Sequence, residues 1–514
     1  MCPFAEKYAE KQCLAHTLVI TPENNEVRLV VTIQTIQMNR FDFRLAGIAG
    51  SMLILFALAD VAHATSEETA ELSYVVKIEL EPKQVTVTGR YRNRASDDIS
   101  SWGNPRWNPF TFGSDELVPE IVRDAGDDLL FTYIADVSDQ PTDATSAFFD
   151  DAHLRAWGWN VLPTPVSQRP PESISVDFDL PQGWAIATSF GTGTSLRLSS
   201  LADLRVLTWM AGDVISEQIE VSGHSVIVMT RQNHPDGLAS LVAATRAIIE
   251  AGMRYAGREA LPGRFAVGFD VGMPAPSPMW AAATRSADLG GTWLSSADAL
   301  WQWQTLGHEL GHFWQFGFTL ASYMGMGMWF SEGVTDYLGL QFSHRAGLYS
   351  DDQFAAIISE SLQEFDRLFA LADSDETKAP LISYPTGMLR GFYLDLALQK
   401  ATDGRVGLSQ VFRVLFDRHL GQTLNPDLFR QSLIDLGGPE IGTLLDRLLD
   451  SNTVRFPALL EGTGFVLEID PDSGQARIRP GPKNAAEQDF LDRFLTNGIL
   501  PTSHEGPANS GSSE

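Results

Sequence analysis

The strongest constraint on the fold of this chain comes from His308, Glu309 and His312, which form a His-Glu-x-x-His motif. If residues 299–317 form a helix, the two histidines lie four positions apart on one face and can direct both imidazoles toward one cation. Glu309 then lies beside them, where its carboxylate can take a proton from a water molecule. Glu332 follows in the sequence and can supply a third ligand. The chain is therefore expected to bring these two segments together.

Two imidazoles and one carboxylate form a ligand set typical of catalytic zinc, which leaves one position open for water. We therefore predict one Zn²⁺ ion held by His308, His312 and Glu332. Asp336 lies four residues after Glu332, on the same helical face, and can accept the free N–H of His308. In the purely structural alternative, the histidines are buried core residues and Glu332 is a first-turn helix carboxylate.

Composition narrows the classes of function. The chain has 514 residues, of which 44% are hydrophobic and 20% charged, so it can form two or three domains with buried cores. Its formal net charge is −28 and its sequence pI is about 4.7. A nucleic-acid partner is excluded because phosphate binding needs clustered Lys and Arg, and the sequence has no such cluster.

The beginning of the chain resembles a secretory signal with extra residues in front. Residues 38–64 contain a basic start, an apolar run at 45–59, and Ala62 and Ala64 at the −3 and −1 positions of a cleavage site. The run has 15 residues, whereas a membrane span needs roughly 20. We predict export, to the periplasm or the medium, with no stable membrane span after cleavage; an uncleaved anchor is the alternative. Residues 1–37 are interpreted as a leader extension that the native protein lacks.

Both cysteines, Cys2 and Cys13, precede the predicted signal. The mature chain would therefore have no thiols, neither for a disulfide nor as metal ligands. Histidine and carboxylate side chains must then hold any metal.

The rest of the sequence divides by its hydrophobic period. Residues 65–232 alternate apolar and polar side chains, for example at 74–80, which predicts an N-terminal antiparallel β-domain. Further strands are predicted at 264–271 and 290–296. Residues with helical spacing then dominate, and the predicted helices are 238–255, 299–317, 330–346, 352–371, 385–402, 407–419, 426–436 and 439–450. The expected fold class is multidomain α+β.

Together, HELGH at residues 308–312 and SEGVTDY at residues 331–337 resemble the gluzincin zinc metallopeptidases. The similarity is greatest to the glycyl aminopeptidase family, a relative of the aminopeptidase N family. This resemblance implies a thermolysin-like catalytic domain at residues 233–455, with a mixed-sheet subdomain and a mainly helical C-terminal subdomain. It also implies a zinc-dependent, aminopeptidase-like activity on peptide substrates, with Glu309 as the catalytic base.

The same resemblance identifies Tyr384 as a candidate site residue. Residues 383–387, SYPTG, are similar to a Tyr-x-x-Gly segment that these families place at the start of a helix. The family's tyrosine hydrogen-bonds the oxyanion of the tetrahedral intermediate, so the resemblance implies this catalytic role for Tyr384.

The sequence departs from the family pattern in four places, one of which is residues 313–317, FWQFG, where the family has basic residues after the second histidine. Between His312 and Glu332 lie 19 residues, one more than in the aminopeptidase N family. The stretch 279–294 lacks the glutamate that binds the substrate amine in aminopeptidases, and Asp288 is its nearest acid. After Gly462 only 52 residues remain (514 minus 462), too few for the complete PDZ domain that relatives often carry. We interpret these residues as part of a short C-terminal segment, 456–501, and a disordered tail, 502–514.

Two other classes of function stay open. A zinc-binding relative without peptidase activity could bind peptides or protein partners. Alternatively, a structural surface protein could use the metal only to stabilise a helix pair. The sequence leaves the oligomeric state and the side-chain preference undetermined.

Overall fold

The structure is a computed structural model of the full chain. It describes residues 15–23, 26–34, 70–92, 99–103, 120–125, 128–135, 137, 147–167, 171–256, 263–270, 281–285, 289–294, 299–315, 319–320, 329–372, 379–419, 423–450 and 455–496. The predicted signal at 38–64, the predicted tail at 502–514, Cys2, Cys13 and Asp288 lie outside the described residues.

The chain divides into two compact units, Met1–Glu68 and Thr69–Glu514. The described part of the first unit is an antiparallel hairpin of β1 (Ala15–Glu23) and β2 (Glu26–Gln34). This hairpin lies within the residues interpreted above as a leader extension. Everything that follows concerns the second unit.

The second unit begins with two packed sheets. The first has the order β13 (Ser195–Leu198), β11 (Ser173–Asp179), β3 (Glu71–Leu80), β4 (Lys83–Arg92), β7 (Asp128–Ala135) and β6 (Glu120–Ala125). Its neighbouring strands are antiparallel except for β11 and β3, which are parallel. Alternate side chains are buried, Tyr74 and Val76 among them, as the period of two predicts.

The second sheet has the order β12 (Ala185–Thr188), β14 (Thr208–Gly212), β9 (His153–Trp157) and β8 (Phe148–Phe149), all antiparallel. Its Leu154 and Trp209 share one apolar core with the first sheet. Smaller elements accompany the two sheets: β5 (Ile99–Gly103), β10 (Thr164–Ser167), α2 (Gly158–Val161) and α3 (Leu201–Val206).

A five-stranded mixed sheet follows. Its order is β15 (Val214–Val221), β16 (His224–Arg231), β17 (Arg264–Phe269), β19 (Leu289–Leu294) and β18 (Ala281–Arg285). The central pairs β16–β17 and β17–β19 are parallel, and the outer pairs are antiparallel. Helix α4 (Gly237–Ala256) connects β16 to β17. Strands β15 and β16 therefore lie in the same sheet as strands that come after residue 232.

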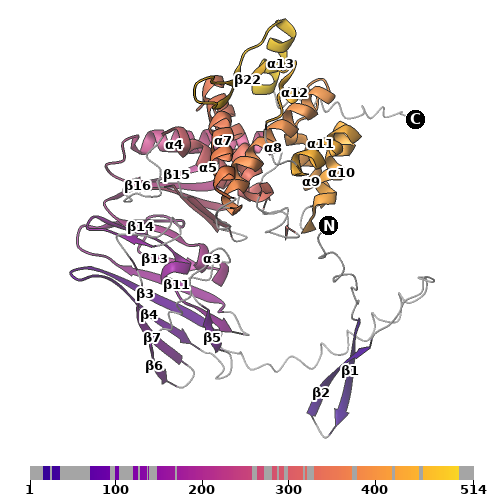
Figure 1. The fold of residues 1–514 in the computed structure, drawn as a ribbon. Helices are drawn as coiled ribbons and strands as arrows, with labels where there is room; N and C mark the ends of the chain where they lie inside the picture. Colours follow the sequence, from indigo (N-terminus) through magenta and orange to yellow (C-terminus); the bar gives the residue numbers. More distant parts are fainter. Residues whose placement is uncertain are drawn as a thin grey trace, which may run out of the picture. The chain divides into compact units, whose positions relative to one another are not determined.

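Helices make up most of the remaining chain (Figure 1). They are α5 (Ala299–Gln315), the π-helix η2 (Trp329–Val334), α6 (Thr335–Arg345), α7 (Asp351–Ala372), α8 (Ala379–Ala401), α9 (Leu408–His419), α10 (Pro426–Gly437), α11 (Pro439–Asp450), α12 (Pro457–Leu460) and α13 (Ala485–Thr496). Two short strand pairs lie among them: β20 (Thr319–Leu320) with β21 (Thr423–Leu424), and β22 (Phe465–Ile469) with β23 (Ala476–Pro480). One apolar core extends through these helices and the five-stranded sheet. The fold class, α+β, is as predicted.

The helices in the described part of the chain are all too short or too polar to span a bilayer.

A buried charged cluster links two of the sheets. His153 on β9 is fully buried, and its Nδ1 lies 3.0 Å from Asp150 Oδ1 while its Nε2 lies 3.2 Å from Asp270 Oδ1. Arg155 Nε lies 2.9 Å from the other oxygen of Asp270. Since Asp270 directly follows β17, the cluster ties the four-stranded sheet to the five-stranded one. Burial alone lowers the pKa of His153, but the hydrogen bonds to Asp150 and Asp270 outweigh it and raise that pKa above the ordinary 6.5.

This shift predicts a dependence of stability on pH. Because the folded protein binds the proton more tightly, the contribution of protonated His153 is complete below pH 6.5 and is lost as the pH rises through the raised folded pKa. Urea unfolding of the wild type should show this loss as the pH is raised above 6.5. His153→Gln should cost roughly 1–3 kcal/mol at pH 6, because Asp270 loses a buried partner, and should make that slope shallower. Equal pH dependence of the free energy of unfolding in the two proteins would contradict this role of His153.

Candidate metal centre

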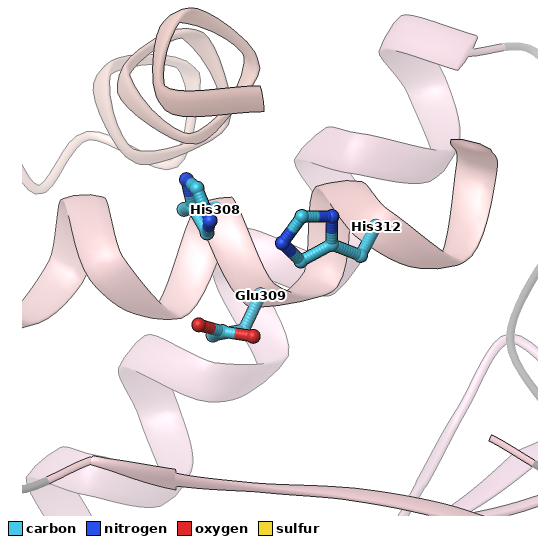
Figure 2. Close-up of side chains that lie close together, drawn as sticks. All are labelled: His308, Glu309 and His312. Carbon is cyan, nitrogen blue, oxygen red and sulfur yellow. The ribbon is translucent and has the colours of Figure 1, made fainter. Parts of the chain in front are cut away.

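Helix α5 carries the first three residues of the candidate site. Leu306, Leu310 and Phe313 are fully buried and anchor the helix in the core, while the turn between them presents His308, Glu309 and His312. Figure 2 shows these three polar side chains projecting from one helix. Their potential ligand atoms all lie within 4.8 Å of one another, and the two imidazole rings are nearly perpendicular, with centroids 4.6 Å apart.

Glu332 approaches both histidines from the second segment. Its Oε2 lies 3.5 Å from His308 Nε2 and 3.7 Å from His312 Nε2. The Glu332 side chain is 11% exposed, so few water molecules can solvate its carboxylate. Two ring nitrogens and one carboxylate oxygen therefore converge on a small volume, as the sequence motif predicted.

The predicted α-helix at 330–346 begins differently from expectation. Residues Trp329–Val334 form a π-helix, and the α-helix starts only at Thr335. A π-helix has wider turns than an α-helix and is frequent at functional sites. Glu332 lies in this π-turn, so its angle around the axis relative to Asp336 differs from that of a regular helix.

Close backbone contact sets the distance between the two segments. A Cβ built on Gly339 of α6 would lie 2.4 Å from the backbone nitrogen of His308, and one built on Gly307 of α5 would lie 2.5 Å from the carbonyl oxygen of Gly339. Only glycines allow the helices to approach this closely at the crossing point. The crossing lies directly beside His308, so it determines how near Glu332 and Asp336 come to the imidazoles.

Asp336 lies on the far side of the His308 ring from Glu332. Its Oδ1 is 2.7 Å from His308 Nδ1, and the same oxygen accepts a hydrogen bond of 2.9 Å from Gln304 Nε2. A hydrogen bond at Nδ1 favours the tautomer whose Nε2 lone pair faces the two other ligand candidates. Asp336 thus has the place predicted for it.

Gln304 was not identified from the sequence. It lies one helical turn before His308 on α5 and is 3% exposed. Its backbone N–H donates to the Tyr349 hydroxyl at 2.8 Å, and its side chain orients Asp336. The four-residue spacing from His308 was the only available signal, and amides at such positions are common on ordinary helices.

Tyr384 reaches the same site from α8. Its ring is nearly parallel to that of His308, with an interplanar angle of 20° and a centroid distance of 6.3 Å. The predicted start of this helix, at residue 385, is wrong. The helix begins at Ala379 and includes Pro385, so Tyr384 lies inside it. Proline often begins a helix, but Pro385 is the seventh residue of α8, where it removes one backbone hydrogen bond and crowds the preceding turn.

The carboxylates around His308 create an environment that favours cations. Burial by itself lowers the pKa of His308, but the charge and hydrogen bond of Asp336, together with Glu332 and Glu309, raise it well above its usual value. Burial raises the pKa of Glu309 to about 7; His308 opposes this rise, whereas Glu332 and Asp336 add to it. A carboxyl group that exchanges a proton near neutral pH suits a general base.

The placement of Asp336 leads to a prediction about zinc affinity. Asp336→Ala removes the acceptor at His308 Nδ1, and loss of such a partner commonly weakens metal binding 10–100-fold. Competition against a chromophoric chelator would measure this change. Asp351→Ala is a matched control, because Asp351 makes a similar contact of 2.9 Å with His344 at the other end of α6. Equal zinc affinities in the wild type and Asp336→Ala would contradict the role of Asp336.

The fold resembles that of a known class of peptidases. An aminopeptidase N family protein from Idiomarina loihiensis matches with a TM-score of 0.59 and 15% sequence identity, over 78% of this chain and 80% of that chain. An M1 zinc metallopeptidase from Deinococcus radiodurans matches with a TM-score of 0.45 and 14% identity, over 76% and 95% of the two chains. The first of these likenesses is close enough to assign the fold.

A protein-family model also matches the segment that carries the candidate site. Residues 301–375 match the model of the M61 glycyl aminopeptidase family. This match contains His308, Glu309, His312, Glu332 and Asp336, and it agrees with the resemblance seen in the motifs. Tyr384 lies beyond the matched residues. No curated protein matches the chain.

Proposed function

We propose that this protein is a zinc-dependent metallopeptidase with aminopeptidase-like activity. The observation that carries the proposal is the approach of Glu332 Oε2 to within 3.5 Å and 3.7 Å of the two histidine Nε2 atoms, beside the buried Glu309. Ligands of a tetrahedral zinc at ordinary Zn–N and Zn–O bond lengths lie about 3.3–3.4 Å from one another. The distances from Glu332 to the two histidines are therefore close to those expected between ligands of one shared Zn²⁺ ion.

Zinc in such a site supplies Lewis acidity, which acidifies water and polarises a peptide carbonyl. Glu309 would accept a proton from the attacking water and deliver it to the leaving amine. Burial raises the pKa of Glu309 above its ordinary value, which favours delivery of the proton to the leaving amine. Tyr384 would donate a hydrogen bond to the oxyanion, and Asp336 would hold His308 in the tautomer that binds metal.

We further propose that these residues belong to a thermolysin-like catalytic domain. The sequence pattern put its start at residue 233, but β15 and β16 pair within the same five-stranded sheet as β17. The proposed domain therefore extends back to Val214 and runs to residue 455. The secretory pattern at residues 38–64 supports export. The other assignments made from the sequence are unchanged: a leader extension at residues 1–37, a β-domain after the signal and a C-terminal segment at residues 456–501.

Hydrolysis of paired peptides tests the function. The full chain, loaded with zinc, should remove the first residue from peptides with a free amine and leave the N-acetylated forms intact. A chelator should abolish this activity, and zinc should restore it. Equal cleavage of acetylated peptides would contradict the aminopeptidase mode but not the peptidase. A zinc-loaded protein that cleaves none of a broad panel would instead support the non-catalytic relative.

A further inference from the structure

One face of α8 packs directly on the segment that carries Glu332. Tyr384, Gly387, Gly391 and Asp395 are separated by three, four and four positions, so they lie along one side of the helix. A Cβ built on Gly387 would lie 2.1 Å from the carbonyl oxygen of Trp329 in η2. One turn further along, a Cβ on Gly391 would lie 3.0 Å from that of Tyr337. Gly387 lets the backbone of α8 contact that of η2 directly, and Gly391 leaves room for the Tyr337 side chain of α6.

Asp395 makes the polar contact at the far end of this face. It is 2% exposed, and its Oδ2 accepts a hydrogen bond of 2.6 Å from the hydroxyl of Tyr337, which is fully buried on α6. Gln341 Nε2 in turn donates to that hydroxyl at 2.6 Å. The other oxygen, Oδ1, accepts from the backbone N–H of Leu408 at 2.8 Å, at the start of α9. Asp395 therefore joins three helices inside the core.

We propose that Asp395, acting through Tyr337, is a positioning residue that sets the register of α8 against η2 and α6 and thereby holds Tyr384 beside His308. The glycine contacts keep the helices close, but smooth glycine surfaces do not prevent sliding or rotation. A short, buried hydrogen bond to a carboxylate has a definite direction and does prevent them. The role of Tyr384 in turnover rests on the proposed function, whereas its placement does not.

Tyr337→Phe tests the proposal, because it removes only the hydroxyl that Asp395 accepts. We expect kcat to fall by about 10-fold or more, since small misplacements of catalytic groups are costly. KM should change less than about threefold, and zinc content should stay at one ion per chain. Tyr393→Phe is the matched control: Tyr393 is equally buried on α8, but its ring faces Phe456, and its kcat should equal that of the wild type.

A double-mutant cycle separates positioning from general stability. If Tyr337 acts through Tyr384, Tyr337→Phe should have little further effect on kcat once Tyr384→Phe is present. Independent, multiplicative losses in the double variant would overturn the proposal.

A measurement without turnover distinguishes failure of this proposal from failure of the proposed function. With 3-fluorotyrosine at position 384, the ¹⁹F resonance should shift or broaden in Tyr337→Phe and stay unchanged in Tyr393→Phe. An unchanged resonance in both would overturn the proposal even in an inactive protein. If Tyr337→Phe does not fold, the nearly isosteric Asp395→Asn replaces it, and the same perturbation of the resonance at position 384 is expected.

Discussion

Glu309→Gln is expected to lower kcat/KM for peptide hydrolysis by about 10²–10⁴-fold, the usual contribution of a general base. The amide keeps the size and much of the hydrogen bonding of the carboxylate, but it cannot take a proton from water. Glu309 is not one of the three proposed ligands, so zinc content should remain at one ion per chain. The measurement is steady-state kinetics on free peptides, with metal analysis of the same samples.

Glu364→Gln controls for the loss of one negative charge. Glu364 lies on α7 and pairs with Arg367 at 2.7 Å, so its substitution should leave kcat/KM within about twofold, as is usual for surface changes. Substantial activity in a fully zinc-loaded Glu309→Gln protein would refute the assignment of Glu309 as the base.

Gly339→Ala is expected to destabilise the fold and abolish zinc binding together. The new Cβ would lie 2.4 Å from the backbone nitrogen of His308 and 2.6 Å from the carbonyl oxygen of Gln304. No change of rotamer can relieve a clash with backbone atoms, so α5 and α6 must separate. We expect a loss of about 3 kcal/mol or more, which exceeds the gain of about 1 kcal/mol from the higher helix propensity of alanine. Urea unfolding and zinc stoichiometry would measure both effects.

Gly193→Ala is the matched control for this substitution. A Cβ at Gly193 would meet only the carbonyl oxygen of Ser195, at an ordinary contact distance of 3.7 Å. Its stability and zinc content should equal those of the wild type. A Gly339→Ala protein with wild-type stability and full zinc occupancy would contradict the view that the glycine crossing sets the geometry of the site.

Local sequence signals located most of the helices. Residues 439–450 were predicted as a helix with the bounds that α11 has, and α10 extends only one residue beyond its prediction. Proline at the first position marks the start of both helices, and glycine marks the end of α10. The Asn425 side chain, which accepts from Leu428 N–H at 2.9 Å, caps the start of α10 and is a further local signal.

Features that depend on distant contacts were not predictable in this way. The hydrophobic period identified β15 and β16 as strands, but it could not tell which sheet they would join. The π-turn at Glu332 depends on packing against α8, where Gly387 contacts Trp329 and Gly333. Such packing leaves no periodic pattern in the π-turn's own residues.

In the candidate site, too, local features could be predicted and features that depend on long-range contacts could not. The spacing of His308 and His312 follows from helical geometry and could be read directly, whereas the π-turn changes the position of Glu332 relative to Asp336. Tyr384 came only from the family resemblance. Gln304 and Asp395 act through contacts 32 and 58 positions away along the chain, with Asp336 and Tyr337, and no local motif points to them.

The central claim is that one zinc ion is held jointly by α5 and η2. The most direct test is a crystal structure of the zinc-loaded protein with anomalous differences recorded on both sides of the zinc absorption edge. We predict a single zinc peak within bonding distance of His308 Nε2, His312 Nε2 and a Glu332 carboxylate oxygen. A peak elsewhere, or a zinc ion that Glu332 does not contact, would contradict this account of the protein.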